Sequence, residues 1–175
     1  MANCSLVYLD IGSNVGDSIQ SFASRRPEAR LAATLQAAGH SQYKPKTTCL
    51  YGFEPAPQHT ARLTALRERL APAFANITIY TETALGGPEQ VAAPMWLAVA
   101  GGRSGVGSHL VSQRPKSGKA TPVRTWRLAA WLRDFIAPAH GPDTPIVMRM
   151  DARAAMWREW ACCSRWGWPS APERG

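Results

Sequence analysis

The sequence predicts an α/β protein with a parallel, Rossmann-like sheet and helices on both faces. A strand, a glycine turn and a helix start follow one another within residues 7–18. Strand and helix patterns then alternate as βαβαβ as far as Tyr80, and a further strand pattern ends at Asp151. Such alternation is the usual basis of a parallel sheet, whose ligands bind at the carboxyl ends of its strands.

The first strand is predicted over residues 6–9, a short apolar run closed by Asp10. Gly12 and Gly16 permit a tight turn that side chains would block, and the polar pair that follows suits the first turn of a helix. This arrangement places backbone N–H groups and the positive end of a helix dipole beside the end of a strand. We therefore expect a nucleotide-like cofactor at this turn.

The next elements follow from apolar periodicity and from prolines that interrupt it. Helical segments are predicted after the glycine turn as far as Pro27, over residues 28–38 and over residues 58–70, with a loop over residues 39–48. Strands are predicted over residues 49–55 and 77–80, and a turn over residues 83–87.

The second half of the chain has a weaker pattern. Residues 91–100 could form an extra strand, and residues 101–107 are expected to be a loop. Apolar residues at helical spacing predict a helix over residues 125–136, ended by Pro138 and Gly141. Residues 145–151 have the pattern of a fourth core strand, which would give the strand order 3-2-1-4.

The composition limits the classes of protein to which the chain can belong. The chain has 175 residues, enough for one domain, and a net charge of +8 without a lysine-arginine run, so no nucleic-acid partner is predicted. An anionic substrate, or a genome rich in arginine codons, explains the charge equally well. No apolar run is long enough for a membrane helix, and the first strand begins almost at Met1, so the protein is expected in the cytoplasm unless its true N-terminus is missing.

The four cysteines are too few for a disulfide framework and lack the paired spacing of a zinc site. A reducing compartment is therefore the default expectation, and no metal is predicted.

Three acids, Asp10, Glu54 and Asp151, are each expected at the end of a core strand, and so at one edge of the sheet. A carboxylate at the end of the second strand can accept both hydroxyls of a ribose, which is the role expected of Glu54. The turn Gly12-x-x-x-Gly16 lacks the three-glycine pattern that brings a backbone against a pyrophosphate. A nucleoside without a bridging pyrophosphate is therefore the expected ligand.

The runs YLDIGSNVGD (residues 8–17) and YGFEPAPQHT (residues 51–60) resemble the FkbM family of S-adenosylmethionine-dependent methyltransferases, which have the class I methyltransferase fold. The runs at residues 107–110, 123–132 and 146–151 fall in the family's order, so the resemblance covers residues 6 to 151. It implies S-adenosylmethionine as cofactor and O-methylation of a small-molecule or glycan-like acceptor as activity.

The resemblance also implies roles for single residues. The cofactor loop would be formed by Asp10, Gly12, Ser13, Asn14 and Gly16, with Glu54 on the ribose and Thr83 and Ala84 near the adenine. Ser108 and His109 would lie on the substrate side, where His109 replaces the family's second serine. Asp151 would be the catalytic acid that orients or deprotonates a hydroxyl, although a strand-end cap is an equally good interpretation. His59 is expected to be a surface residue.

The chain departs from the family after Asp151. The family's acid-glycine-acid pattern is absent, and 24 residues remain where three more strands would be expected. Residues 1–151 would form the methyltransferase-like domain, and residues 152–175 an atypical tryptophan-rich tail. We hypothesise that the chain is incomplete or that its tail is translated out of frame from about residue 152. The fourth strand would be an exposed edge, so self-association is plausible.

Two further functions stay open. The chain could be a catalytically inactive nucleoside-binding or interaction module that keeps the loop and lacks the substrate side. A dinucleotide oxidoreductase is disfavoured because the third glycine is absent.

Overall fold

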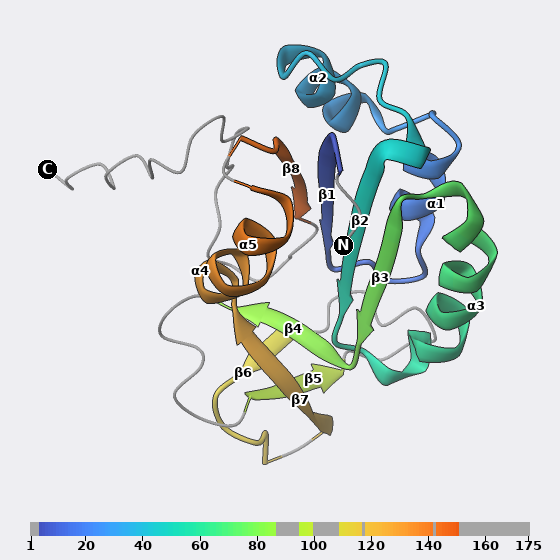
Figure 1. Ribbon diagram of the computed structural model, residues 1–175. Coiled ribbons are helices and arrows are strands. Elements are labelled where there is room, and N and C mark those ends of the chain that lie inside the picture. The colour runs from blue at the N-terminus through green and yellow to red at the C-terminus, as the bar shows by residue number, and fades with distance from the viewer. Residues whose placement is uncertain (1–3, 87–94, 100–108, 117, 142, 151–175) are drawn as a thin grey trace, which may run out of the picture.

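The computed structural model describes residues 4–86, 95–99, 109–116, 118–141 and 143–150. In this part of the chain the strands form two four-stranded sheets, in the orders β3-β2-β1-β8 and β4-β7-β5-β6. The strands of the first sheet point their carboxyl ends toward the second sheet (Figure 1). The architecture is therefore a mixed α/β fold with two sheets rather than one.

The first sheet consists of β1 (Leu6–Ile11), β2 (Thr48–Glu54), β3 (Asn76–Thr81) and β8 (Ile146–Met150). All its pairings are parallel. The predicted order of the four core strands is confirmed, with β8 beside β1. One detail is wrong: Asp10 does not close the first strand, because β1 continues to Ile11 and Asp10 pairs in register with Gly52.

One face of this sheet is covered by helices that the sequence predicts. They are α1 (Asp17–Ala23), α2 (Ala29–Ala37) and α3 (Thr60–Leu70), with short 3-10 turns η1 (Pro45–Thr47), η2 (Pro57–His59) and η3 (Ala71–Ala73). Each α-helix buries two apolar side chains at helical spacing. These side chains pack on alternate residues of the strands, because successive side chains of a strand point to opposite faces.

A helical segment made of α4 (Leu128–Trp131), the π-helical turn η5 (Leu132–Ile136) and α5 (Ala137–His140) packs on the other face. Helices on both faces are thus confirmed. The predicted helix limits are shifted, since residues 125–127 belong to β7 and the helical segment continues past Pro138 to His140. Gly141 follows its end, as predicted. Pro138 follows the π-helical turn η5 directly and lies in the first turn of α5.

The second sheet consists of β4 (Thr83–Gly86), β5 (Met95–Val99), β6 (His109–Val111) and β7 (Lys119–Arg127). The predicted turn over residues 83–87 is wrong for residues 83–86, which pair in parallel with β7. The extra strand predicted in residues 91–100 is confirmed for residues 95–99. The loop predicted over residues 101–107 lies outside the described residues.

A small apolar cluster joins the two sheets. Ala56, which follows β2, is buried with Met95 and Leu97 of β5 and Val123 of β7. The second sheet therefore packs against the chain that leaves the carboxyl end of β2. This contact places the second sheet beside the edge where the sequence predicts a ligand.

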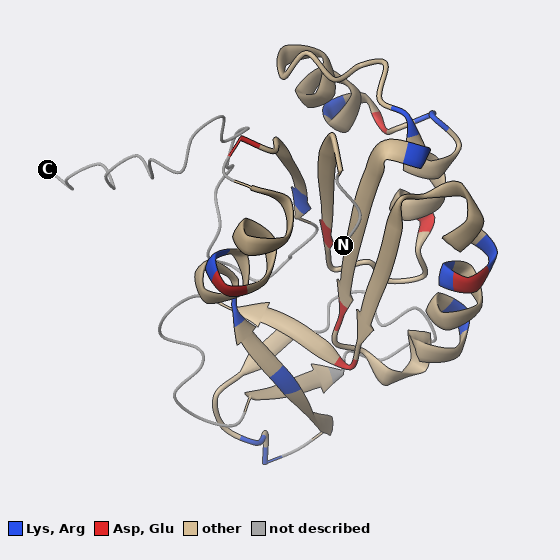
Figure 2. Cartoon of the chain, in the orientation of Figure 1, with Lys and Arg blue, Asp and Glu red and all other residues tan. Residues whose placement is uncertain are grey.

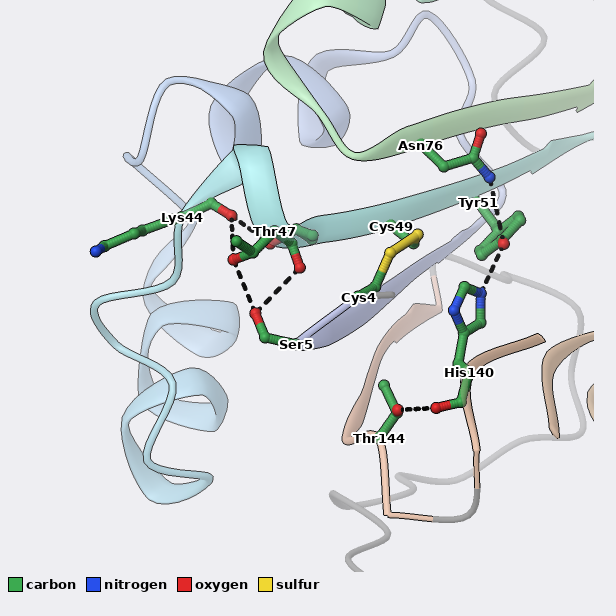
Figure 3. The surroundings of a disulfide bond; sticks show 10 residues. Cys4, Ser5, Lys44, Thr47, Cys49, Tyr51, Asn76, His140 and Thr144 are labelled. Atoms are coloured by element: carbon green, nitrogen blue, oxygen red, sulfur yellow. Dashed lines mark hydrogen bonds between the residues drawn. A yellow bond between two sulfur atoms is a disulfide. The ribbon is translucent and has the colours of Figure 1, made fainter. Parts of the chain in front are cut away.

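A disulfide between Cys4 and Cys49 crosses from the chain before β1 to β2, with the Cα atoms 5.7 Å apart (Figure 3). Both residues are buried. The expectation of a reduced chain is wrong for this pair. Sequence spacing could not show it, because the two cysteines are 45 positions apart and meet only through the parallel pairing of β1 and β2.

Lys and Arg residues are spread over helices and strands of both sheets (Figure 2). Within the described residues, no helix is long and apolar enough to cross a membrane. The tail, residues 152–175, and Asp151 lie outside the described residues. The proposed domain boundary and self-association through β8 stay predictions.

Candidate cofactor site

The glycine turn folds back over the end of β2. The backbone N–H groups of Gly12 and Ser13 both donate to the carbonyl of Phe53, at 2.9 and 3.0 Å, and the N–H of Gly16 donates to the carbonyl of Ser13 at 2.7 Å. Gly12, Asn14 and Gly16 have φ angles of 82°, 49° and 86°. This left-handed backbone favours glycine and tolerates asparagine, so the turn needs these residue types.

Two glycines allow the turn to lie close to its neighbours. A Cβ on Gly16 would lie 2.3 Å from Cδ2 of Leu66 in α3. A Cβ on Gly52 would lie 3.0 Å from Oγ of Ser13 and 3.1 Å from Cδ1 of Ile19. Gly52 was missed in the sequence, although a glycine inside an otherwise apolar strand indicates a close approach of another backbone.

Glu54 ends β2 and holds the turn from its other side. Its Oε2 accepts the backbone N–H of Asn14 at 2.6 Å, and its Oε1 accepts the backbone N–H of Ala56 at 2.8 Å. Burial raises the pKa of Glu54, while the two N–H groups and the nearby His59 oppose that shift. The carboxylate is therefore fixed in orientation at the carboxyl edge of the sheet. His59 itself is buried rather than on the surface, contrary to expectation.

Asn14 contributes a polar atom that the described chain leaves without a partner. Its Oδ1 is buried, and among the described residues it accepts no hydrogen bond. A buried acceptor without a donor costs about 1–3 kcal/mol. The backbone N–H of the same residue donates to Glu54, so the residue that carries this acceptor is in direct contact with the carboxylate.

Asp10 is fully buried and its carboxylate is engaged within the protein. Its Oδ2 accepts the hydroxyl of Ser18 at 2.7 Å, and its Oδ1 accepts the hydroxyl of Tyr8 at 3.3 Å. Arg149 of β8 lies 3.5 Å from the same Oδ1 and donates from Nε to Glu28 at 2.7 Å. Burial raises the pKa of Asp10 and outweighs the opposing effects of Ser18 and Arg149. Asp10 thus stabilises the turn from the interior of the protein.

These partners of Asp10 were also missed from the sequence. Tyr8 carries one signal, since it lies two residues before Asp10 in a strand and so on the same face. Ser18 and Arg149 reach Asp10 only through the packing of α1 and β8.

The other predicted site residues are buried, exposed or outside the described residues. Ser13 is buried and turns its hydroxyl inward, to the carbonyl of Asp10 at 3.1 Å. Thr83 and Ala84 are buried at the start of β4, where the hydroxyl of Thr83 donates to the carbonyl of Thr81 at 2.9 Å. His109 is exposed on β6, the last strand in the order of the second sheet. Ser108, like Asp151, lies outside the described residues.

The backbone N–H groups of the glycine turn were expected to face a ligand, and the structure shows a different arrangement. Those of Gly12, Ser13, Asn14 and Gly16 all donate within the chain, so these four do not form an open cradle for an anion. The helix that follows, α1, has only seven residues. The structure thus brings together Asp10, the turn and Glu54, as a closely bonded turn with a carboxylate and one acceptor that has no partner among the described residues.

Comparisons of the chain with protein families, with curated proteins and with solved structures find no match.

Proposed function

We propose that the chain binds S-adenosylmethionine at the glycine turn and Glu54, and that it is a methyltransferase resembling the FkbM type. The observation that carries the proposal is the pair of acceptors at the carboxyl edge of the first sheet. They are the oriented carboxylate of Glu54 and the Oδ1 of Asn14, which has no partner among the described residues. In parallel α/β sheets this edge is the usual ligand site.

The residues present fit a nucleoside. Each oxygen of Glu54 accepts one backbone N–H and keeps further acceptor capacity, which suits the two hydroxyls of a ribose. Asn14 Oδ1 adds an acceptor for a third donor, such as the amino group of the methionine part. A ligand rich in hydroxyl and amino donors would supply a partner for this buried acceptor, which has none in the part of the chain that the structure describes.

The same contacts disfavour a dinucleotide. A pyrophosphate needs backbone N–H groups that point at it, as glycine-rich phosphate loops provide. In this turn the N–H groups of Gly12, Ser13, Asn14 and Gly16 are already donated within the chain. The turn therefore suits a nucleoside without phosphates better than NAD.

S-adenosylmethionine would supply a methyl group already activated by its sulfonium, so the chain's task is positioning and exclusion of water. Glu54 would hold the ribose, and the acceptor hydroxyl would approach from the side of the second sheet. Asp151 follows Met150, which pairs with Ile11 at the end of β1, so we propose that Asp151 takes the hydroxyl proton. Ser108 and His109 are proposed on the acceptor side, and Thr83 and Ala84 near the adenine.

A second candidate function is an inactive nucleoside-binding module. It is favoured by the missing acid-glycine-acid pattern after Asp151. This candidate shares the cofactor site and differs only in the absence of methyl transfer.

The substitution Asn14→Gly tests the site because it removes the free acceptor while keeping a residue that accepts a φ of 49°. We expect affinity for S-adenosylmethionine to fall by about 0.5–1.5 kcal/mol, roughly threefold to tenfold, by titration calorimetry. Stability against urea should not fall, because the substitution removes a buried acceptor that has no partner among the described residues.

The matched control is Arg25→Gly, which also relaxes a positive φ, 58°, at an exposed residue outside the turn. It should leave the affinity unchanged. Equal affinities of the wild-type chain and the Asn14→Gly variant would remove Asn14 from the site.

A further inference from the structure

A second cluster of ligand-type side chains lies on the opposite face of the first sheet from α1. Cys4 precedes β1, Cys49 lies in β2 and His140 ends α5, and one ligand atom from each lies within 4.8 Å of the others. Figure 3 shows the histidine ring beside the two sulfur atoms. Three segments that are distant in the sequence therefore converge on one point, where Cys4 and Cys49 form the disulfide.

Within the described residues, the ring of His140 uses one nitrogen in a hydrogen bond and leaves the other nitrogen without a partner. Its Nε2 lies 2.9 Å from the hydroxyl oxygen of Tyr51, which also accepts an N–H from Asn76 at 3.3 Å. Its Nδ1 is buried and has no hydrogen-bond partner among the described residues. When Nε2 carries the proton and donates it to Tyr51, Nδ1 presents a lone pair. Metal-bound histidines are commonly oriented by a hydrogen bond of this kind from the other ring nitrogen.

A cavity of about 400 Å³ reaches this cluster. Cys49 and His140 belong to its lining, together with Tyr51, Asn76 and aromatic side chains of β3 and the α4–α5 segment. The cavity therefore offers room for a water molecule beside Cys49 and the histidine ring. The cavity is separate from the glycine turn, whose residues do not belong to its lining.

We propose that Cys4, Cys49 and His140 bind a zinc ion when the disulfide is reduced, so that disulfide and metal are alternative states of one site. Two thiolates and one imidazole are ligands that zinc prefers, and a water from the cavity completes four-coordination. A dithiol supplies the two electrons and two protons that open the disulfide and is itself oxidised to a disulfide. Binding of zinc then releases the two thiol protons.

The experiment uses the full chain with Cys162→Ser and Cys163→Ser, so that only Cys4 and Cys49 can supply thiolates. The protein is reduced with a phosphine, freed of metal and titrated with Co²⁺, whose thiolate charge-transfer and visible bands report coordination. We expect one equivalent to bind, zinc to displace it, and the oxidised protein to show no bands.

Variants assign the ligands. His140→Ala keeps the disulfide, so its fold is checked by circular dichroism before reduction, and it should bind Co²⁺ at least tenfold more weakly. Tyr51→Phe should weaken binding by roughly tenfold, as for other partners of a ligating histidine. His40→Ala is the matched control and should bind normally.

Three results would overturn the proposal: no thiolate bands in the reduced chain, unchanged binding by His140→Ala, or a disulfide that opens only when the chain unfolds.

Discussion

Gly16 is the residue on which the geometry of the turn depends most. It combines a φ of 86° with a site where a Cβ would lie 2.3 Å from Cδ2 of Leu66. Gly39 offers a matched comparison, since its φ is 74° and no atom lies within 4 Å of a built Cβ.

Alanine at Gly39 should cost about 1–2 kcal/mol of unfolding free energy, the cost of a left-handed backbone for a residue with a Cβ. Alanine at Gly16 should cost about 1–3 kcal/mol more, because the buried side chain of Leu66 must also shift. Urea unfolding of both variants measures the difference. Equal losses would mean that Leu66 moves aside freely and that Gly16 is required for its φ alone.

For single residues, the sequence is most informative at positions where the backbone conformation determines the residue type. Gly12, Gly16 and Glu54 could be predicted because a left-handed turn needs glycine and because the acid stands before a proline that ends the strand. The contacts of side chains could not be predicted. The inward hydroxyl of Ser13 and the free Oδ1 of Asn14 depend on how the turn lies against β2.

At the level of secondary-structure elements, the contacts of Asp10 and Arg149 connect three segments that are distant in the sequence. Asp10 lies in β1, Arg149 in β8, and Glu28 directly before α2 accepts a hydrogen bond from Arg149. Glu28 is half exposed, whereas the Asp10 side chain has no exposed surface. The two acids therefore differ in burial while sharing one guanidinium.

Asp10→Ala should lower the free energy of unfolding by about 3 kcal/mol, because the hydroxyls of Tyr8 and Ser18 and the guanidinium of Arg149 lose their acceptor. Glu28→Ala should cost at most about 1 kcal/mol, as for exposed ion pairs. Urea unfolding at neutral pH measures both.

Asp10→Asn gives the control, because burial already raises the pKa of this carboxyl and so a neutral group is tolerated there. Its loss should be smaller than that of Asp10→Ala. A loss as large for Glu28→Ala as for Asp10→Ala would contradict this account of the network.

The core strands could be predicted from the sequence, whereas most of the second sheet could not. The difference has a physical reason. The core strands are buried, apolar and separated by helices of regular period, so their pattern is local. The strands β4 and β6 are short, and β7 contains Pro122. Such segments become strands only by pairing with one another, and that pairing is not encoded in their own periodicity.

For the whole molecule, the sequence predicts the parallel sheet, its strand order and helices on both faces. It could not predict how the second sheet packs on the chain after β2, where Ala56 meets Met95, Leu97 and Val123. Nor could it predict the meeting of Cys4, Cys49 and His140, since that depends on the α4–α5 segment lying across β1 and β2. Pairing through β8 stays a prediction.

We propose that the carboxyl edge of the first sheet binds S-adenosylmethionine. Calorimetric titration of the folded chain with this cofactor, and with NAD as the control, tests it most directly, with circular dichroism to confirm the fold. The account predicts saturable binding of S-adenosylmethionine and no comparable binding of NAD, because four loop N–H groups are already donated within the chain. A folded chain that binds neither, or that binds NAD more tightly, would contradict the claim.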